Sequence, residues 1–92
     1  MRIAVIDDLE RDARQLADQV STYMSTHRIP ADTPEIFPGG EEFLAGFMPG
    51  VYDIIFLDIY MNGINGMETA SKIRLWDTSC HIIFVTTSSD FA

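Results

Sequence analysis

Short apolar runs that end in acidic residues limit most strongly what this chain can fold into. Residues 54–57 form one such run and lead into Asp58, and a loop rich in glycine and asparagine follows. This run is continuous rather than alternating, which is typical of a strand buried on both faces in a parallel sheet. Residues 2–6 form a second short run, which ends in Asp7 and Asp8. The sequence therefore predicts two strands that each carry carboxylates to the point where the strand reaches the surface.

Amphipathic patterns separate the apolar runs. Residues 9–28 carry apolar side chains three and four positions apart, so we expect a helix that Asp8 can cap. A shorter helix is predicted to open at Glu41, after a glycine pair that turns the chain. A third helix is predicted to start at Asn65, which resembles a capping box with Glu68. Its inward face is expected to comprise Met67, Ala70 and Ile73.

Two further strands complete the predicted sheet. One is short and near an edge, because residues 36–37 lie close to prolines on both sides. The other is a buried strand over residues 81–85. Strands and helices then alternate, with the last helix missing, which is the signature of a doubly wound α/β sheet with right-handed crossovers. We therefore predict one domain over residues 1–92, with a flavodoxin-like parallel sheet in the strand order 2-1-3-4.

The acidic residues are expected to meet in one pocket. In the flavodoxin-like order the winding direction reverses between the first and third strands, and the ligand site of such sheets lies there. Asp7, Asp8 and Asp58 end these strands, and two carboxylates about 4 Å apart would repel by on the order of 4 kcal/mol at an effective dielectric of about 20. A shared proton or a hard cation must offset that repulsion, and an all-oxygen site suits Mg²⁺ better than zinc. Thr86 ends the neighbouring strand, so its hydroxyl could reach an anion attached to Asp58.

Composition excludes several classes of protein. Fourteen acids against six bases give a net charge of -8, which opposes direct binding to a nucleic acid backbone. No apolar run approaches the roughly 20 residues that span a membrane, and the N-terminus lacks the pattern of a signal peptide. A single cysteine, Cys80, cannot form an internal disulfide, so we expect a cytoplasmic protein. His27 and His81 are expected on the surface, with no cysteine pair nearby to bind zinc.

Together these residues resemble the receiver domain of two-component response regulators, which has a CheY-like fold. The resemblance covers essentially all 92 residues, through the acidic pair, the acid after the third strand, the glycine-containing loop and the threonine after the fourth strand. The string from Asp58 to Gly66, followed by the Ile-Phe-Val-Thr strand end, is most similar to receivers that precede a LytTR-type DNA-binding domain. The resemblance thus implies a role in signal transduction and in the regulation of transcription.

The resemblance implies a role for each site residue. Asp58 would be the phosphoacceptor, taking a phosphoryl group from a phosphohistidine on a sensor histidine kinase. Asp7, Asp8 and Asp58 would hold Mg²⁺ together with the backbone carbonyl of Tyr60. Thr86 would hydrogen-bond the phosphoryl group and couple phosphorylation to a change of shape that switches an output. The chain would not be an enzyme beyond its own phosphorylation and dephosphorylation.

The chain departs from the family pattern in two places. Asn62 occupies a position that is usually proline, a change that we expect to be tolerated. The family also has helices 4 and 5 and a fifth strand that ends in a lysine, all absent here, and Lys72 cannot replace that lysine because it lies on the solvent face of the third helix. We therefore expect a C-terminally incomplete receiver, a fragment rather than a natural short form, in which residues 89–92 begin helix 4. The strand over residues 81–85 would then be an exposed apolar edge, which favours a homo-oligomer.

Two other classes of function stay open from the residues. The missing lysine also fits a receiver-like module that binds partners without being phosphorylated. The third class is a phosphatase with an aspartate nucleophile after the first strand, but that pattern needs Asp-x-Asp, whereas here the two acids are adjacent and Leu9 follows. Asp58 alone, or Thr86 alone, would also suit an ordinary turn. The predicted function therefore depends on their combination with the acidic pair.

Overall fold

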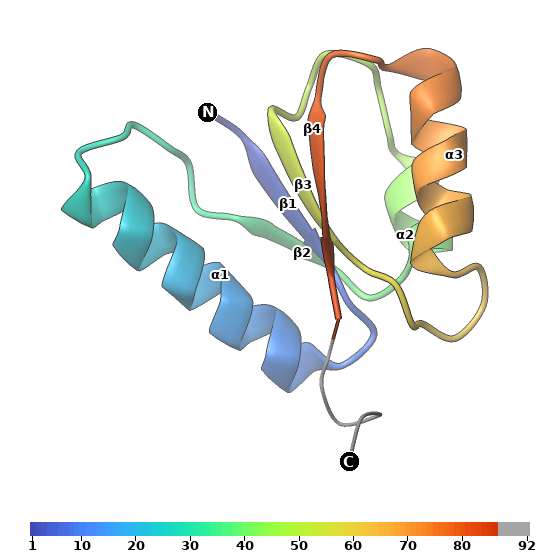
Figure 1. Ribbon diagram of the computed structural model, residues 1–92, viewed down its shortest axis with the longest axis horizontal. Helices are drawn as coiled ribbons and strands as arrows, with labels where there is room; N and C mark the ends of the chain where they lie inside the picture. The colour runs from blue at the N-terminus through green and yellow to red at the C-terminus, as the bar shows by residue number, and fades with distance from the viewer. Residues whose placement is uncertain (87–92) are drawn as a thin grey trace.

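A four-stranded parallel sheet forms the centre of the molecule (Figure 1). The computed structural model describes residues 1–86, and its strands are β1 (Ile3–Ile6), β2 (Glu35–Phe37), β3 (Ile54–Asp58) and β4 (His81–Val85). All pairings are parallel and the order is β2-β1-β3-β4, so the predicted doubly wound, flavodoxin-like sheet is confirmed. The two strands with the acidic ends, β1 and β3, lie side by side at its centre.

Helices cover both faces of the sheet. α1 (Glu10–Thr26) lies on one face, and α2 (Gly40–Ala45) and α3 (Gly66–Trp76) lie on the other (Figure 1). β1 and β3 bury side chains on both sides, as a continuous apolar pattern requires. The core under α1 is built on Val5, Ala13 and Ala17, and the larger core under α2 and α3 includes Ile6, Phe43, Leu57 and Ile73. Within residues 1–86, no helix has the length and apolar character needed to cross a membrane.

The helix starts differ in how they are capped. α3 begins with the predicted capping box: the Asn65 side chain accepts a hydrogen bond from the Glu68 N–H at 2.9 Å, and the Glu68 carboxylate accepts one from the Asn65 N–H at 3.4 Å. The prediction that Asp8 caps α1 is wrong, because Leu9 is the N-cap residue and no side chain caps this helix. Asp8 is engaged elsewhere: its Oδ2 accepts from the Asn62 N–H at 2.9 Å.

The buried face of α3 corrects a second prediction. Ala70 and Ile73 are buried as expected, but Met67 is 55% exposed. The buried residues of this helix are Gly66, Thr69, Ala70 and Ile73, which follow the spacing of a single helical face. Met67 lies one position off that face and therefore points toward solvent.

β4 is an edge strand in the described part of the chain. It pairs with β3 on one side, and Ile83 and Phe84 are 43% and 41% exposed. The prediction of a buried strand over residues 81–85 is therefore wrong, whereas the predicted exposed apolar edge is present. Ile82 packs against the core under α2 and α3 and holds the strand in place. The helix start predicted at residues 89–92 lies outside the described residues.

Gly66 lets α3 approach the end of β3 closely. A Cβ atom on Gly66 would lie 2.8 Å from the Ile59 Cα atom and would collide with the Asp58 carbonyl oxygen. The Gly66 N–H also donates to the Ile59 carbonyl at 3.0 Å, which closes the loop that follows Asp58. A side chain at this position must therefore displace backbone.

We predict that Gly66→Ala lowers the free energy of unfolding by on the order of 2 to 4 kcal/mol, because a collision with backbone cannot be relieved by a rotamer change. Gly46→Ala is the matched control, since a Cβ atom there meets nothing within 4 Å. Urea unfolding of both variants tests this prediction. Equal losses of stability in the two variants would contradict the close approach of α3 to β3.

Candidate functional site

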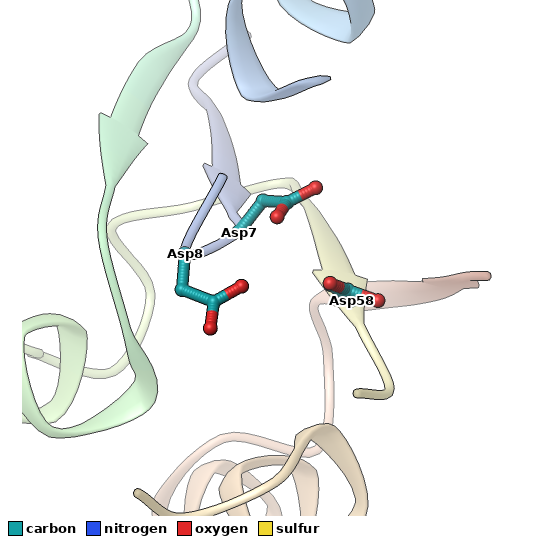
Figure 2. A group of neighbouring side chains, drawn as sticks. All are labelled: Asp7, Asp8 and Asp58. Atoms are coloured by element: carbon teal, nitrogen blue, oxygen red, sulfur yellow. The ribbon is translucent and has the colours of Figure 1, made fainter. Parts of the chain in front are cut away.

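Three carboxylates meet at the carboxyl ends of β1 and β3 (Figure 2). Asp7 and Asp8 follow β1, and Asp58 is the last residue of β3. One oxygen of each carboxylate lies within 4.8 Å of the others, so the structure brings the three predicted acids together. Asp7 and Asp58 are only 5% and 2% exposed, whereas Asp8 is half-buried. The cluster therefore combines two buried acids with one that solvent reaches.

Backbone amides hold the two buried carboxylates in place. Asp7 Oδ1 accepts from the Leu9 N–H at 2.9 Å, and Asp58 Oδ1 accepts from the Tyr60 N–H at 3.2 Å. The second oxygen of Asp58, Oδ2, is buried and has no hydrogen-bond partner among residues 1–86. A buried polar atom without a partner is costly, so this oxygen is a position at which a bound group would be stabilising.

The raised pKa values of two acids show that burial makes the cluster costly to ionise. The pKa of Asp58 is raised to about 6, mainly by burial and also by the neighbouring acids, while the N–H of Tyr60 opposes the rise. Burial likewise raises the pKa of Asp7. Asp77, before β4 at the other end of the sheet, is the opposite case: the backbone N–H groups of Gly50, Cys80 and Ser79 lower its pKa. The same residue type thus becomes costly or favourable to ionise according to its burial and its backbone donors.

The donor set of the cluster fits a hard divalent cation. All of its ligand atoms are carboxylate oxygens, and Mg²⁺–O bonds of about 2.1 Å place opposite ligands about 4.2 Å apart. The observed spacing of up to 4.8 Å is close to that of one octahedral ion, with water completing the shell. The cluster contains neither cysteine nor histidine, which disfavours zinc.

Tyr60 is close to the cluster along the chain, and Thr86 is brought near it by the pairing of β3 with β4. Tyr60 follows two residues after Asp58 and has an exposed ring. Thr86 directly follows Val85, which is the ladder partner of Asp58, and the Val85 carbonyl accepts from the Ile59 N–H at 3.1 Å. β3 and β4 therefore end side by side, which brings the exposed Thr86 to the same edge of the sheet. The metal-ligand role of the Tyr60 carbonyl and the phosphoryl contact of Thr86 stay predictions.

Three residues that we expected on the surface are exposed. His27 and His81 are exposed, at the end of α1 and the start of β4. Lys72 is exposed on α3, as predicted. None of the three belongs to the acidic cluster.

Sequence reasoning missed a contact between α2 and the loop after β3. Glu41 was expected only to open α2, but its Oε2 accepts from the Ile64 N–H at 3.1 Å. The two residues are 23 positions apart, so no local spacing rule links them. The glycine-rich character of the loop could be seen in the sequence, but the contact of the loop with Glu41 could not.

The fold and the acidic cluster define a class of protein: a doubly wound α/β domain with three carboxylates at its topological switch point. The sequence matches the response regulator receiver domain over residues 3–92, and the chain belongs to this family. It is 32% identical over 92 residues to the sensory transduction protein LytR of Staphylococcus epidermidis, which covers 100% of this chain and 34% of that protein. It is 38% identical over 52 residues to LytR of Staphylococcus haemolyticus, which covers 56% of this chain and 20% of that protein. The chain thus spans well under half the length of these relatives, and the matches agree with the predicted likeness to LytTR-associated receivers.

Solved structures share the same fold. The response regulator TrrA of Thermotoga maritima, in complex with Mg²⁺-BeF, has a TM-score of 0.79 and 32% identity, covering 98% of this chain and 72% of that chain. A complex of the histidine kinase ThkA with TrrA gives a TM-score of 0.76 and 33% identity, covering 96% of this chain and 70% of that chain. The response regulator DrrB of Thermotoga maritima, 20% identical over 92% of this chain and 35% of that chain, has a TM-score of 0.74 and shares the fold. The predicted CheY-like fold is confirmed.

We predict that Asp58→Asn stabilises the metal-free chain at neutral pH. Because the pKa of Asp58 rises on folding to about 6, ionisation favours the unfolded state, and the wild-type chain should lose stability as pH rises from about 4 to about 7. The advantage of Asp58→Asn over the wild type should therefore grow by on the order of 2 kcal/mol across that range.

Urea unfolding at several pH values, without divalent cations, measures this difference. Asp18→Asn is the control, because Asp18 is exposed on α1 and lies outside the cluster. An advantage of Asp58→Asn that does not change with pH would contradict a costly charge at this position.

Proposed function

We propose that this receiver domain accepts a phosphoryl group on Asp58 from a sensor histidine kinase and thereby switches an output. The observation that carries the proposal is the buried Oδ2 of Asp58, which has no hydrogen-bond partner in the described part of the chain and lies within the acidic cluster. The related structure of TrrA in complex with the histidine kinase ThkA supports the proposed partner. The Mg²⁺-BeF complex of TrrA supports a divalent cation at this kind of site.

In the proposed reaction, Asp58 Oδ2 attacks the phosphorus of a phosphohistidine. An O–P bond forms, the N–P bond breaks, and the electron pair of that bond stays on the imidazole nitrogen. Asp7, Asp8, Asp58 and the Tyr60 carbonyl would hold Mg²⁺, which when bound offsets the charge of the carboxylates and of the phosphoryl group. The hydroxyl of Thr86 would donate to a phosphoryl oxygen, because β4 ends beside β3. A loose transition state of this kind needs positioning and charge neutralisation more than a further catalytic base.

We further propose that residues 1–92 act as the receiver part of a cytoplasmic regulator whose output lies elsewhere in the protein. The LytR relatives are much longer than this chain, which leaves room in them for an output domain. A net charge of -8 opposes direct DNA contact by these residues, so regulation of transcription would act through another domain.

Phosphorylation is tested by incubating the chain with a small phosphodonor such as acetyl phosphate and following the mass of the intact protein. The wild type and Asp18→Asn should each gain one base-labile phosphoryl group when Mg²⁺ is present. Asp58→Asn should gain none, and chelation of Mg²⁺ should abolish the gain in every variant. Modification of Asp58→Asn at the wild-type rate would contradict the assignment, and no modification of any variant would favour a phosphorylation-independent interaction module.

The exposed edge of β4 supports a second prediction, that the 92-residue chain self-associates. Ile83 and Phe84 are large, apolar and partly exposed on a strand with an unpaired edge among residues 1–86. Ile83→Lys should lower the average mass measured by light scattering at micromolar concentration, because a lysine on an edge strand opposes pairing. Leu75→Lys, on the exposed surface of α3, is the control. A monodisperse monomer for the wild type would contradict self-association.

A further inference from the structure

Alternate backbone amides of the loop after β3 each donate to a different carboxylate. The Tyr60 N–H donates to Asp58 Oδ1 at 3.2 Å, and the Asn62 N–H donates to Asp8 Oδ2 at 2.9 Å. The Ile64 N–H donates to Glu41 Oε2 at 3.1 Å. The loop is therefore fastened by acids from β3, from the segment after β1, and from α2.

Two of these three carboxylates would change their surroundings when a cation binds. Asp58 and Asp8 belong to the acidic cluster, so their oxygens would share their negative charge with the cation. Glu41 is not part of the cluster. Its bond to the loop therefore involves no carboxylate of the cluster.

Two glycines let α2 pack closely enough against the loop for Glu41 to reach the Ile64 N–H. Gly63 has a φ of +77°, and a Cβ atom there would lie 2.9 Å from Glu41 Oε1 and 3.0 Å from its Cδ. The absence of that Cβ lets the carboxylate lie over the loop backbone. Gly40 plays the matching part on α2, because a Cβ atom there would lie 2.9 Å from Ile64 Cδ1 and would collide with the Thr69 hydroxyl. Small residues on both sides thus bring the first turn of α2 against the loop.

We propose that Glu41 is a positioning residue: it holds the loop after β3 so that the backbone of Tyr60 and Asn62 stays in place beside the acidic cluster. This inference rests on the proposed function for its effect on the cation, since the Tyr60 carbonyl is a ligand only in that proposal. The role needs an acceptor oxygen at this position, because the partner is a backbone N–H, and an amide oxygen can accept from it in place of the carboxylate.

Three variants separate positioning from a general loss of charge or of helix stability. Glu41→Ala removes the acceptor, whereas Glu41→Gln keeps an amide oxygen that can accept from the same N–H. Glu42→Ala removes an equal charge from the same helix turn, and among the described residues the Glu42 side chain accepts no loop amide. All three variants should unfold at the same urea concentration as the wild type, since the contact lies at the exposed surface.

The first measurement is the hydrogen exchange of the Ile64 amide, followed by NMR without divalent cations. Exchange should be faster by on the order of tenfold in Glu41→Ala, because the loop N–H loses its acceptor. It should stay at the wild-type rate in Glu41→Gln and Glu42→Ala. Unchanged exchange in Glu41→Ala would overturn the inference, whatever the chain does with a cation.

The second measurement is the affinity for Mg²⁺ by calorimetric titration. Glu41→Ala should bind Mg²⁺ on the order of tenfold more weakly, the usual loss when an outer partner of a metal site is removed. Glu41→Gln should restore the wild-type affinity, and Glu42→Ala should keep it. Faster exchange with unchanged Mg²⁺ affinity would overturn the positioning role. A wild-type chain that binds no Mg²⁺ would instead contradict the proposed function, while the exchange data would still decide whether Glu41 fastens the loop.

Discussion

The crowding of three carboxylates, two of them buried, at one edge of the sheet is the constraint on which the rest of the site depends. β1 and β3 are adjacent and parallel, so their acidic ends must meet, and burial then raises the pKa of both Asp7 and Asp58. Asp77 shows that the fold can stabilise an ionised carboxylate, since three backbone N–H groups donate hydrogen bonds to it. Asp58 receives one amide and keeps an oxygen without a partner among residues 1–86. The site therefore carries unfavourable charge that a bound cation or a covalent modification would relieve.

The scaffold keeps this crowding in place by core packing on both faces of the sheet and by close backbone approach. Core side chains on both faces fix β1 and β3, so their ends cannot move apart without opening two cores. Gly66 lets α3 start directly against the Asp58 backbone, and Gly40 does the same for α2 against the following loop. Each glycine takes the place of a side chain that would push the loop outward. The geometry of the loop after β3 thus depends on the missing Cβ atoms of these glycines as well as on the contacts that are made.

Features that depend on periodicity along the chain could be predicted from the sequence. The apolar runs indicated the strands, their acidic ends indicated the cluster, and Asn65 with Glu68 indicated the start of α3. The errors arise where a residue or strand far away in the sequence determines the contact. Asp8 was expected to cap α1, but it accepts from an amide 54 positions away, and β4 was expected to be buried although residues 1–86 place no strand on its outer side. Glu41 was missed for the same reason, because only the fold brings it to Ile64.

The contact between Asn62 and Asp8 gives the departure from the family pattern a physical meaning. Proline, usual at this position in the family, has no N–H, whereas Asn62 uses its N–H to reach Asp8 at 2.9 Å. A proline ring would restrain the backbone covalently. Here a charge-assisted hydrogen bond between the segments that follow β1 and β3 restrains it instead. That bond is strongest when Asp8 carries its full negative charge and weakens as the charge is shared. In this chain the strength with which the loop is held at Asn62 therefore depends on the charge that Asp8 carries.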